Sequence, residues 1–455
     1  MVACKRPARE RMSSVDAAWW RMDRPHRPMA IVGLLLLDRR PDLRHLRARF
    51  AQHLPAWPRL RQRPVRDDDG VWWEDDRGFR LARHVTRRPF AGGSAARLKP
   101  LLARLAVEPF DPQRPFWELA LVDEVGRGAA LLVRIHHCYA DGVGLVQLLS
   151  ALLDTPDGQA APARAPSAAP AGNRLEEVLG LVRDLGRAGA GADGAANGDF
   201  TRIAARVGLD LVQLANAPDE TPTRYKGKPG RVKRVAWSKA LSVAQVKSVA
   251  RAFGCSAGEL LLACVAGALG AQLRALGDDV RTTEIRVLLP VNLRGMRQAG
   301  EALGNHFGLA LLPLPLGIGN PVVRAWEIHR RMLAARHSAQ AALIQLLLGI
   351  VGLLPVEIQR DAIDALAAKS TAVATIVPGP HRARHLAGAR IDDMLFWVPQ
   401  SGDIGLGVSI LSYDGRYRIG LIGDAKLLPQ PQQVIARVEA EFARLPAIAA
   451  LLGDF

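Results

Sequence analysis

The feature that most constrains the fold is a change of hydrophobic pattern in the first third of the chain. Residues 129–135 form an apolar run that only Arg134 interrupts, which predicts a buried strand. Residues 143–153 are rich in Leu, with polar breaks at Gln147 and Ser150, which predicts a helix packed on a sheet. A buried strand that leads directly into such a helix indicates a mixed α/β fold.

The turn between this strand and this helix reads His-His-Cys-Tyr-Ala-Asp-Gly over residues 136–142. Loops at the carboxyl ends of strands often carry the reactive groups of open α/β sheets. Successive strand side chains point to opposite faces, so we expect one imidazole to face a cavity and the other to hold the loop from behind. An imidazole titrates at about pH 6.5 and suits general-base work on a hydroxyl or thiol. Asp141 is a candidate N-cap or an acceptor that holds the loop, and Gly142 allows a tight turn.

A purely structural reading of the two histidines has to be weighed against a functional one. A histidine pair at a strand end is more often structural than catalytic, and neighbouring rings that diverge bind one metal ion poorly. The cysteines form no metal-ligand pair either, so we predict no metal site and reduced thiols in a cytoplasmic protein. The basic N-terminus lacks the apolar segment of a signal peptide.

The 455 residues, 49% of them hydrophobic, are enough for two domains with a sizeable core. Lys and Arg number 61 against 44 Asp and Glu, and the net charge of +17 indicates an acidic partner. Nucleic acid is one candidate, but no zinc-finger spacing or RNA-recognition signature is present. Anionic lipid headgroups or a phosphate-bearing acyl-CoA fit the charge as well.

An Ala/Pro-rich stretch followed by a Gly/Ala run predicts a linker with short crossover helices at 156–230. We therefore predict domains at 1–155 and 231–455. The most apolar stretch, 339–354, is shorter than the ~20 residues that span a bilayer, and we interpret it as a core or tunnel-lining helix. Association with a membrane surface stays open as the alternative.

The hydrophobic pattern predicts a regular alternation of further strands and helices. Helices are expected to open at Asp42, Ser242, Ser256 and Asn320. Strands are expected at 31–37, 71–73, 79–85, 116–122, 232–237, 285–290, 372–377, 392–398, 405–413 and 416–422.

The pattern His-His, three residues, Asp-Gly resembles the active-site motif of the chloramphenicol-acetyltransferase-like acyltransferases. These include peptide-synthetase condensation domains, plant-type alcohol acyltransferases and bacterial wax ester synthase/diacylglycerol acyltransferases. The chain is most similar to the last family, over nearly its full length. Further segments that resemble this family follow in the family's order: Met12–Asp16, Arg114–Glu118, Pro290–Arg294, Leu303–Asn305, Val377–Pro380, Leu386–Ala389 and Leu411–Gly415.

The resemblance implies an α/β (α+β) fold of two chloramphenicol-acetyltransferase-like domains, each a mixed sheet with flanking helices, and an active-site tunnel at their interface. It implies that His137 takes a proton from an acceptor hydroxyl and returns it to the CoA thiolate. His136 and Asp141 would hold the loop, with Gly142 in its turn. Arg294 is the expected ion partner of Asp141, against the alternative of an exposed Arg after a strand. No metal and no cofactor are implied, since acyl-CoA is a substrate.

The same resemblance implies a substrate channel lined by Pro115, Phe116, Trp117, Gly258 and Asn292, with a simple core position as the alternative for Pro115 and Trp117. Two positions depart from the family pattern. Gly258-Glu259 stands where the family usually has Asn-Asp, and Ile376 stands where an Asn usually precedes Val-Pro-Gly-Pro. Both changes bear on oxyanion stabilisation or substrate positioning, and the loss of one oxyanion donor costs about 10²–10³ in rate. We expect either that a backbone N–H substitutes for the lost side chains or that this chain has altered specificity or low activity.

The resemblance implies an O-acyltransferase that moves a fatty acyl group from acyl-CoA to a long-chain alcohol or diacylglycerol, giving wax ester or triacylglycerol. The expected location is the cytoplasm, with peripheral contact to an anionic membrane's inner face or to a lipid droplet as a further expectation. The alternatives are a related acyltransferase with a carrier-protein-bound donor and a catalytically weak, lipid-binding paralogue. A nucleic-acid partner is not expected.

Overall fold

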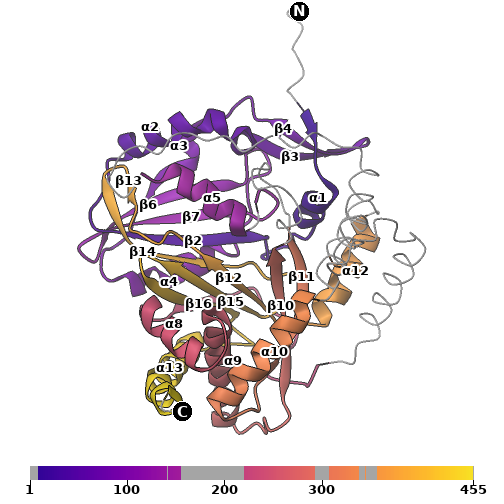
Figure 1. Ribbon diagram of the computed structural model, residues 1–455. Helices are drawn as coiled ribbons and strands as arrows, with labels where there is room; N and C mark the ends of the chain where they lie inside the picture. The colour runs from indigo at the N-terminus through magenta and orange to yellow at the C-terminus, as the bar shows by residue number, and fades with distance from the viewer. Residues whose placement is uncertain are drawn as a thin grey trace, which may run out of the picture.

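In the described part of the chain, three β-sheets and the helices packed on them make up the fold (Figure 1). The computed structural model describes residues 9–140, 142–154, 220–292, 307–337, 344 and 356–453. Most of the predicted linker, the apolar stretch 339–354 except for residue 344, and residues 141 and 294 lie outside the described part. The expected mixed α/β class is confirmed.

The N-terminal sheet has six strands in the order β13-β14-β2-β7-β6-β5. Its central pair, β2 and β7, is antiparallel and almost wholly buried, which explains the continuous apolar runs in both strands. The strands are β2 (Ala30–Leu37), β5 (Val85–Arg88), β6 (Trp117–Val125), β7 (Gly128–His136), β13 (His385–Leu386) and β14 (Ala389–Trp397).

Short helices and a small sheet surround this N-terminal sheet. The small sheet has the order β1-β4-β3, from β1 (Arg9–Arg11), β3 (Gln62–Asp67) and β4 (Gly70–Asp75). The helices and 3₁₀ turns are α1 (Ser14–Arg21), α2 (Leu43–His53), η1 (Leu54–Ala56), η2 (Pro58–Arg61), α3 (Leu81–His84), η3 (Ala95–Leu98), α4 (Lys99–Leu105) and α5 (Gly142–Leu152). As predicted, Asp42 caps α2 by accepting a hydrogen bond from the Arg44 amide.

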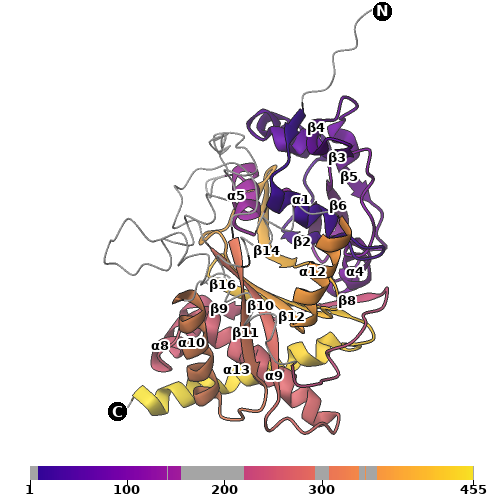
Figure 2. The ribbon, with the colours of Figure 1, turned by 90° about the vertical axis from the view of Figure 1, so that its right-hand side faces the viewer.

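The C-terminal sheet has seven strands in the order β11-β10-β12-β15-β16-β8, with β9 paired to β16. These strands are β8 (Lys233–Trp237), β9 (Leu241–Ser242), β10 (Glu284–Asn292), β11 (Phe307–Pro315), β12 (Ala372–Pro378), β15 (Leu406–Tyr413) and β16 (Arg416–Asp424). The described helices in this half of the chain are α8 (Val243–Ala252), α9 (Ala257–Ala275), α10 (Pro321–His337), α12 (Val356–Ala368) and α13 (Pro431–Gly453). Figure 2 shows α8, α9, α10 and α13 on the side of this sheet that faces away from the N-terminal half.

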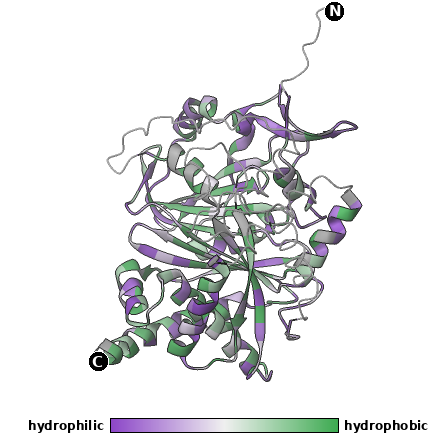
Figure 3. Cartoon of the chain, turned by 45° about the vertical axis from the view of Figure 1, so that its right-hand side comes forward, coloured by the Kyte–Doolittle hydropathy of each residue, from purple (hydrophilic) through white to green (hydrophobic). Residues whose placement is uncertain are grey.

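The core between the two sheets joins both halves of the chain. One hydrophobic cluster combines Leu35 and Val133 of the N-terminal sheet with Leu288, Val377 and Leu411 of the C-terminal sheet. In Figure 3 the hydrophobic segments run mainly through the centre of the molecule. Burial of such a shared apolar surface, at about 25 cal/mol per Å², is the main force that holds the halves together.

Strand β14 comes from the C-terminal half but belongs to the N-terminal sheet, where it pairs antiparallel with β2. In Figure 1 its gold arrow lies beside the indigo β2. The Trp397 indole of β14 donates to the Ala236 carbonyl of β8, so the strand also contacts the other sheet. The N-terminal sheet therefore includes a strand from beyond the predicted domain boundaries at residues 155 and 231. The division of the chain into domains at these positions stays a prediction.

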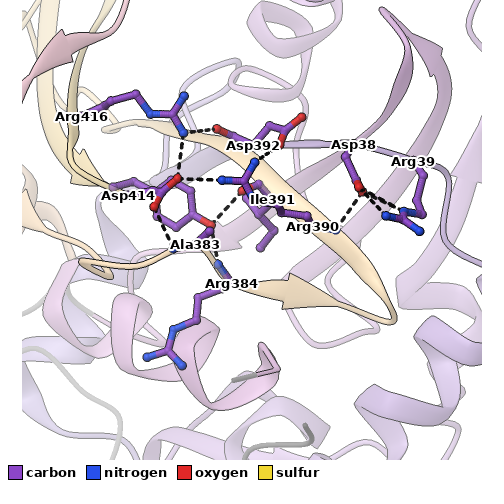
Figure 4. Close-up of polar contacts among 10 residues, drawn as sticks. Asp38, Arg39, Ala383, Arg384, Arg390, Ile391, Asp392, Asp414 and Arg416 are labelled. Atoms are coloured by element: carbon purple, nitrogen blue, oxygen red, sulfur yellow. Dashed lines mark hydrogen bonds and ion pairs between the residues drawn. The ribbon is translucent and has the colours of Figure 1, made fainter. Parts of the chain in front are cut away.

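A network of charged groups anchors the start of β14 (Figure 4). The Arg390 amide donates to the Asp38 carboxylate beyond the end of β2, at 2.8 Å. The Arg390 guanidinium pairs with Asp414 in the β15–β16 turn, and Arg416 bonds both Asp414 and the Asp392 carbonyl. These contacts link one end of β14 to both sheets.

The strand predicted at 79–85 is wrong. Residues Leu81–His84 form the short helix α3, and β5 begins only at Val85. The helical turn brings the buried His84 ring between Phe79 and Trp117, at centroid distances of 5.1 and 4.5 Å, and its Nδ1 lies 2.7 Å from the Trp117 carbonyl oxygen. This tertiary packing overrides the alternation of apolar residues that indicated a strand.

Helix α9 is the one helix in the described ranges with the length and composition of a membrane span. Of the 18 consecutive residues that give this helix its apolar composition, 78% are buried inside the protein. Both α10 and α13 pack against it. It is therefore the central helix of the C-terminal core. Ser256 caps it, and Ser256 with Glu259 completes a capping box.

Candidate active site

Two cavities lie between the sheets and meet at the histidine loop. The first encloses about 1020 Å³, including its mouth, and its walls come from β2, β7, α5, β12 and β14. The second encloses about 620 Å³ between α1, α12, β10 and β12. Four residues line both cavities: His137, Pro290, Thr375 and Val398. Nearly all other lining side chains are apolar, which suits aliphatic chains.

His137 lies at this junction, directly after the end of β7. Its backbone amide donates to the Met29 carbonyl at 2.7 Å, which fixes the turn against the start of β2. Its half-buried imidazole stacks on the Trp19 indole of α1, with ring centroids 4.2 Å apart and planes inclined by 18°. The ring is therefore held at the point where both cavities open.

His136 points away from the cavities and is fully buried. Its Nε2 lies 2.9 Å from the Asp23 carboxylate, and its Nδ1 accepts the Cys138 amide at 3.1 Å. The accepting Nδ1 assigns the hydrogen to Nε2, which donates to Asp23. The geometry matches the expected division of labour, in which one histidine faces a cavity and the other holds the loop.

Two further residues of the motif, Cys138 and Tyr139, are fully buried. The buried Tyr139 hydroxyl donates to the Gln62 carbonyl at 2.7 Å and accepts the Phe116 amide at 3.0 Å. Burial raises the pKa of the Cys138 thiol well above its usual range, and the carboxylates of Asp16 and Asp23 raise it further. Cys138 is thus a protonated, fully buried side chain and no candidate nucleophile.

Three of the five residues predicted to form a substrate channel lie together in the structure. Pro115, Phe116 and Trp117 do not line either cavity and pack behind the histidine loop. Phe116 meets the His136 ring edge-on at 5.7 Å, and the Trp117 indole donates to the Leu60 carbonyl at 2.8 Å. Their buried contacts correspond to the core alternative.

Gly258 and Ile376, the two departures from the family pattern, contact each other. A Cβ atom on Gly258 would lie 3.0 Å from two carbons of the Ile376 side chain, and Ile376 lines the first cavity. The isoleucine thus fills the space that the glycine leaves open. Beside them, burial opposes ionisation of Glu259, but hydrogen bonds from Ser256 and His329 and the charge of Arg336 outweigh it and lower its pKa.

The remaining predicted residues are only partly described. Gly142 is the first residue of α5, and Asn292 is the last residue of β10. Asp141 and Arg294 lie outside the described residues, so their ion pair stays a prediction. Within the described ranges, no group of three or more His, Cys, Asp or Glu side chains is arranged to hold a metal ion.

Three residues of the site were not predicted from the sequence: Asp23, which bonds His136, Trp19 as the stacking partner of His137, and Thr375 at the junction. Asp23 is one of 44 acidic residues, and its contact with His136 joins positions 113 apart in the chain. Trp19 lies in α1 and Asp23 lies two residues after its last residue, so no helical spacing in the sequence links the two.

Sequence comparisons identify relatives across nearly the whole chain. Residues 12–260 match the family model described as wax ester synthase/diacylglycerol acyltransferase catalytic domain, and residues 303–446 match the WS/DGAT C-terminal domain. A probable diacylglycerol O-acyltransferase of Mycobacterium tuberculosis is 28% identical over 474 residues, which cover 96% of each chain.

Solved structures share the fold at lower sequence identity. The wax ester synthase/diacylglycerol acyltransferase from Marinobacter aquaeolei VT8 is 19% identical with a TM-score of 0.69, covering 97% of this chain and all of that one. The first condensation domain of the calcium-dependent antibiotic synthetase is 17% identical with a TM-score of 0.62, covering 97% and 96%. Because both family models match this chain, it belongs to the wax ester synthase/diacylglycerol acyltransferase family, a family of acyltransferases.

Proposed function

We propose that the protein transfers a fatty acyl group from acyl-CoA to the hydroxyl of a long-chain alcohol or a diacylglycerol. The observation that carries the proposal is the position of His137 where two apolar cavities meet. Two lipid substrates need two apolar compartments, and the transfer needs one proton-accepting group within reach of both.

In this mechanism His137 is the general base. It takes the proton of the acceptor hydroxyl as that oxygen attacks the thioester carbonyl carbon and forms the new C–O bond. The tetrahedral intermediate then collapses, the C–S bond breaks, and the imidazolium returns the proton to the CoA thiolate. Stacking on Trp19 and the Met29 hydrogen bond keep the imidazole oriented through both transfers.

The apolar walls contribute to this chemistry by excluding water. A thioester in a wet site would be hydrolysed, whereas an aliphatic cavity favours attack by an alcohol that brings its own apolar chain. Water exclusion also strengthens the electrostatic interactions of the reacting atoms. Wax ester or triacylglycerol would be the product, according to the acceptor that binds.

The test is release of free CoA thiol from palmitoyl-CoA, with hexadecanol and a diacylglycerol offered separately and the lipid product identified. The His137→Ala variant should lose about 10²–10⁴ in kcat, the usual contribution of a general base. The exposed His381 supplies a matched control, because His381→Ala removes an imidazole that lines neither cavity and should keep the wild-type rate.

Each outcome separates the proposal from its alternatives. Wild-type turnover by the His137 variant would refute the base. Transfer from acyl-carrier protein but not from acyl-CoA would reassign the donor. Binding of palmitoyl-CoA with no turnover on any alcohol would identify a lipid-binding protein instead.

A further inference from the structure

Among the described residues, the junction of the two cavities contains one side chain, besides His137, with a hydrogen-bond donor. Of the four described residues that line both cavities, Pro290 has no N–H group, and the Val398 side chain is aliphatic. Thr375 carries the remaining polar group, a hydroxyl. In the first cavity, every other described lining residue is aliphatic, aromatic, Gly, Pro or Met.

The geometry of β12 directs Thr375 toward the cavities. Alternate residues of a strand share a face, and Val373 and Val377, two positions on either side of Thr375, belong to the cavity walls and to the core between the sheets. Ala374 packs on the opposite face, in the core of the C-terminal helices, whereas the side chain of Ile376 contacts that core and also reaches the wall of the first cavity. A hydroxyl at 375 therefore projects to the same space as the His137 ring.

An acyl transfer at this junction generates a charge that needs such a donor. When the acceptor oxygen attacks the thioester, the carbonyl oxygen becomes an oxyanion inside a largely apolar cavity. An uncompensated charge there is very costly, and a preorganised hydrogen-bond donor lowers the barrier by stabilising it. The side chains of Gly258 and Ile376 cannot donate hydrogen bonds, which leaves this task to another group.

We propose that the Thr375 hydroxyl is a catalytic group that donates a hydrogen bond to the thioester oxygen, most strongly once that oxygen is negatively charged. This inference rests on the proposed acyl transfer. His137 carries the proton from the acceptor oxygen to the departing sulfur, and Thr375 stabilises the oxyanion between the two steps. Its own proton stays on the hydroxyl throughout, so atoms and charges balance without any further reactant.

The test compares Thr375→Val, which keeps the side chain's shape but removes the hydroxyl, with Thr375→Ser, which keeps the hydroxyl. Release of CoA thiol from palmitoyl-CoA with hexadecanol is measured for both. Thr375→Val should lower kcat about 100-fold with KM changed only a few-fold, because the bond strengthens in the transition state. Thr375→Ser should stay within about tenfold of the wild type.

Thr86→Val is the matched control, since Thr86 lies on the edge strand β5 and lines neither cavity. It should leave kcat unchanged, and thermal melting of all variants checks folding. Wild-type kcat in Thr375→Val would overturn the inference and leave the proposed function standing. Equal loss in the Val and Ser variants would also overturn it, because shape rather than the hydroxyl would then matter. Absence of transfer by the wild type would overturn both proposals.

Discussion

The Asp23 carboxylate accepts hydrogen bonds that position the histidine loop, and we expect its removal to lower both the stability of the protein and its catalytic rate. One of its oxygens accepts the Met29 amide at 2.6 Å and also contacts His136 Nε2 at 2.9 Å. Met29 in turn accepts the backbone amide of His137. Asp23→Ala therefore removes the acceptor of two buried donors and loosens both histidines.

The structure sets the expected size of this effect. Each buried donor left unpaired costs about 1–3 kcal/mol, and His136 and Met29 are 0% and 2% exposed. Because the Asp23 side chain is 34% exposed, water offsets part of the loss, and we expect about 2–4 kcal/mol in the free energy of unfolding. Displacement of the His137 turn should also lower kcat by about tenfold to 100-fold.

Urea denaturation and CoA release on the same preparations would measure both effects. Asp23→Asn keeps an acceptor oxygen and should recover most of the stability. Asp68→Ala removes an exposed carboxylate and serves as the control for a change of charge alone. If Asp23→Ala were as stable as the wild type within about 0.5 kcal/mol, the Asp23 hydrogen bonds to Met29 and His136 would not stabilise the fold and the reasoning would be refuted.

Three further predictions concern other parts of the site and the core. Burial lowers the pKa of His53, so the folded state binds fewer protons than the unfolded state; stability should fall as pH drops below about 6.5, and His53→Leu should flatten that decline in urea midpoints. Gly33 lines the first cavity opposite Val133, and Gly33→Ala should favour short over long acyl chains or alcohols, whichever tail lies there; identical chain-length profiles would contradict this. Gly258→Ala should push Ile376 into the cavity at a cost of about 1–3 kcal/mol in the free energy of unfolding. The same change should reduce diacylglycerol turnover more than hexadecanol turnover, and adding Ile376→Val should relieve both effects.

Local pattern was sufficient to predict the strand and helix that flank the histidine turn. The apolar run at 129–135 and the Leu-rich stretch after it became β7 and α5 within a residue or two. Such elements depend on neighbouring residues, whose periodicity is visible in the sequence. The opposite orientations of the His136 and His137 side chains also followed from strand geometry alone.

Contacts between distant positions could not be predicted in the same way. Nothing near Gly258 indicates that Ile376 fills its space, and nothing near β2 indicates that β14 pairs with it. The same limit explains Trp117, whose motif suggested a channel but whose indole is satisfied by the Leu60 carbonyl inside the core. These features depend on tertiary packing between segments that the sequence keeps far apart.

The position of β14 in the N-terminal sheet has a consequence for biosynthesis. Until residue 397 has left the ribosome, β2 has no neighbour on one side, and a long apolar edge stays available for pairing with other chains. The nascent N-terminal half should therefore need chaperone protection for most of the time that translation takes. Truncation before β14 should give insoluble fragments rather than a smaller folded unit.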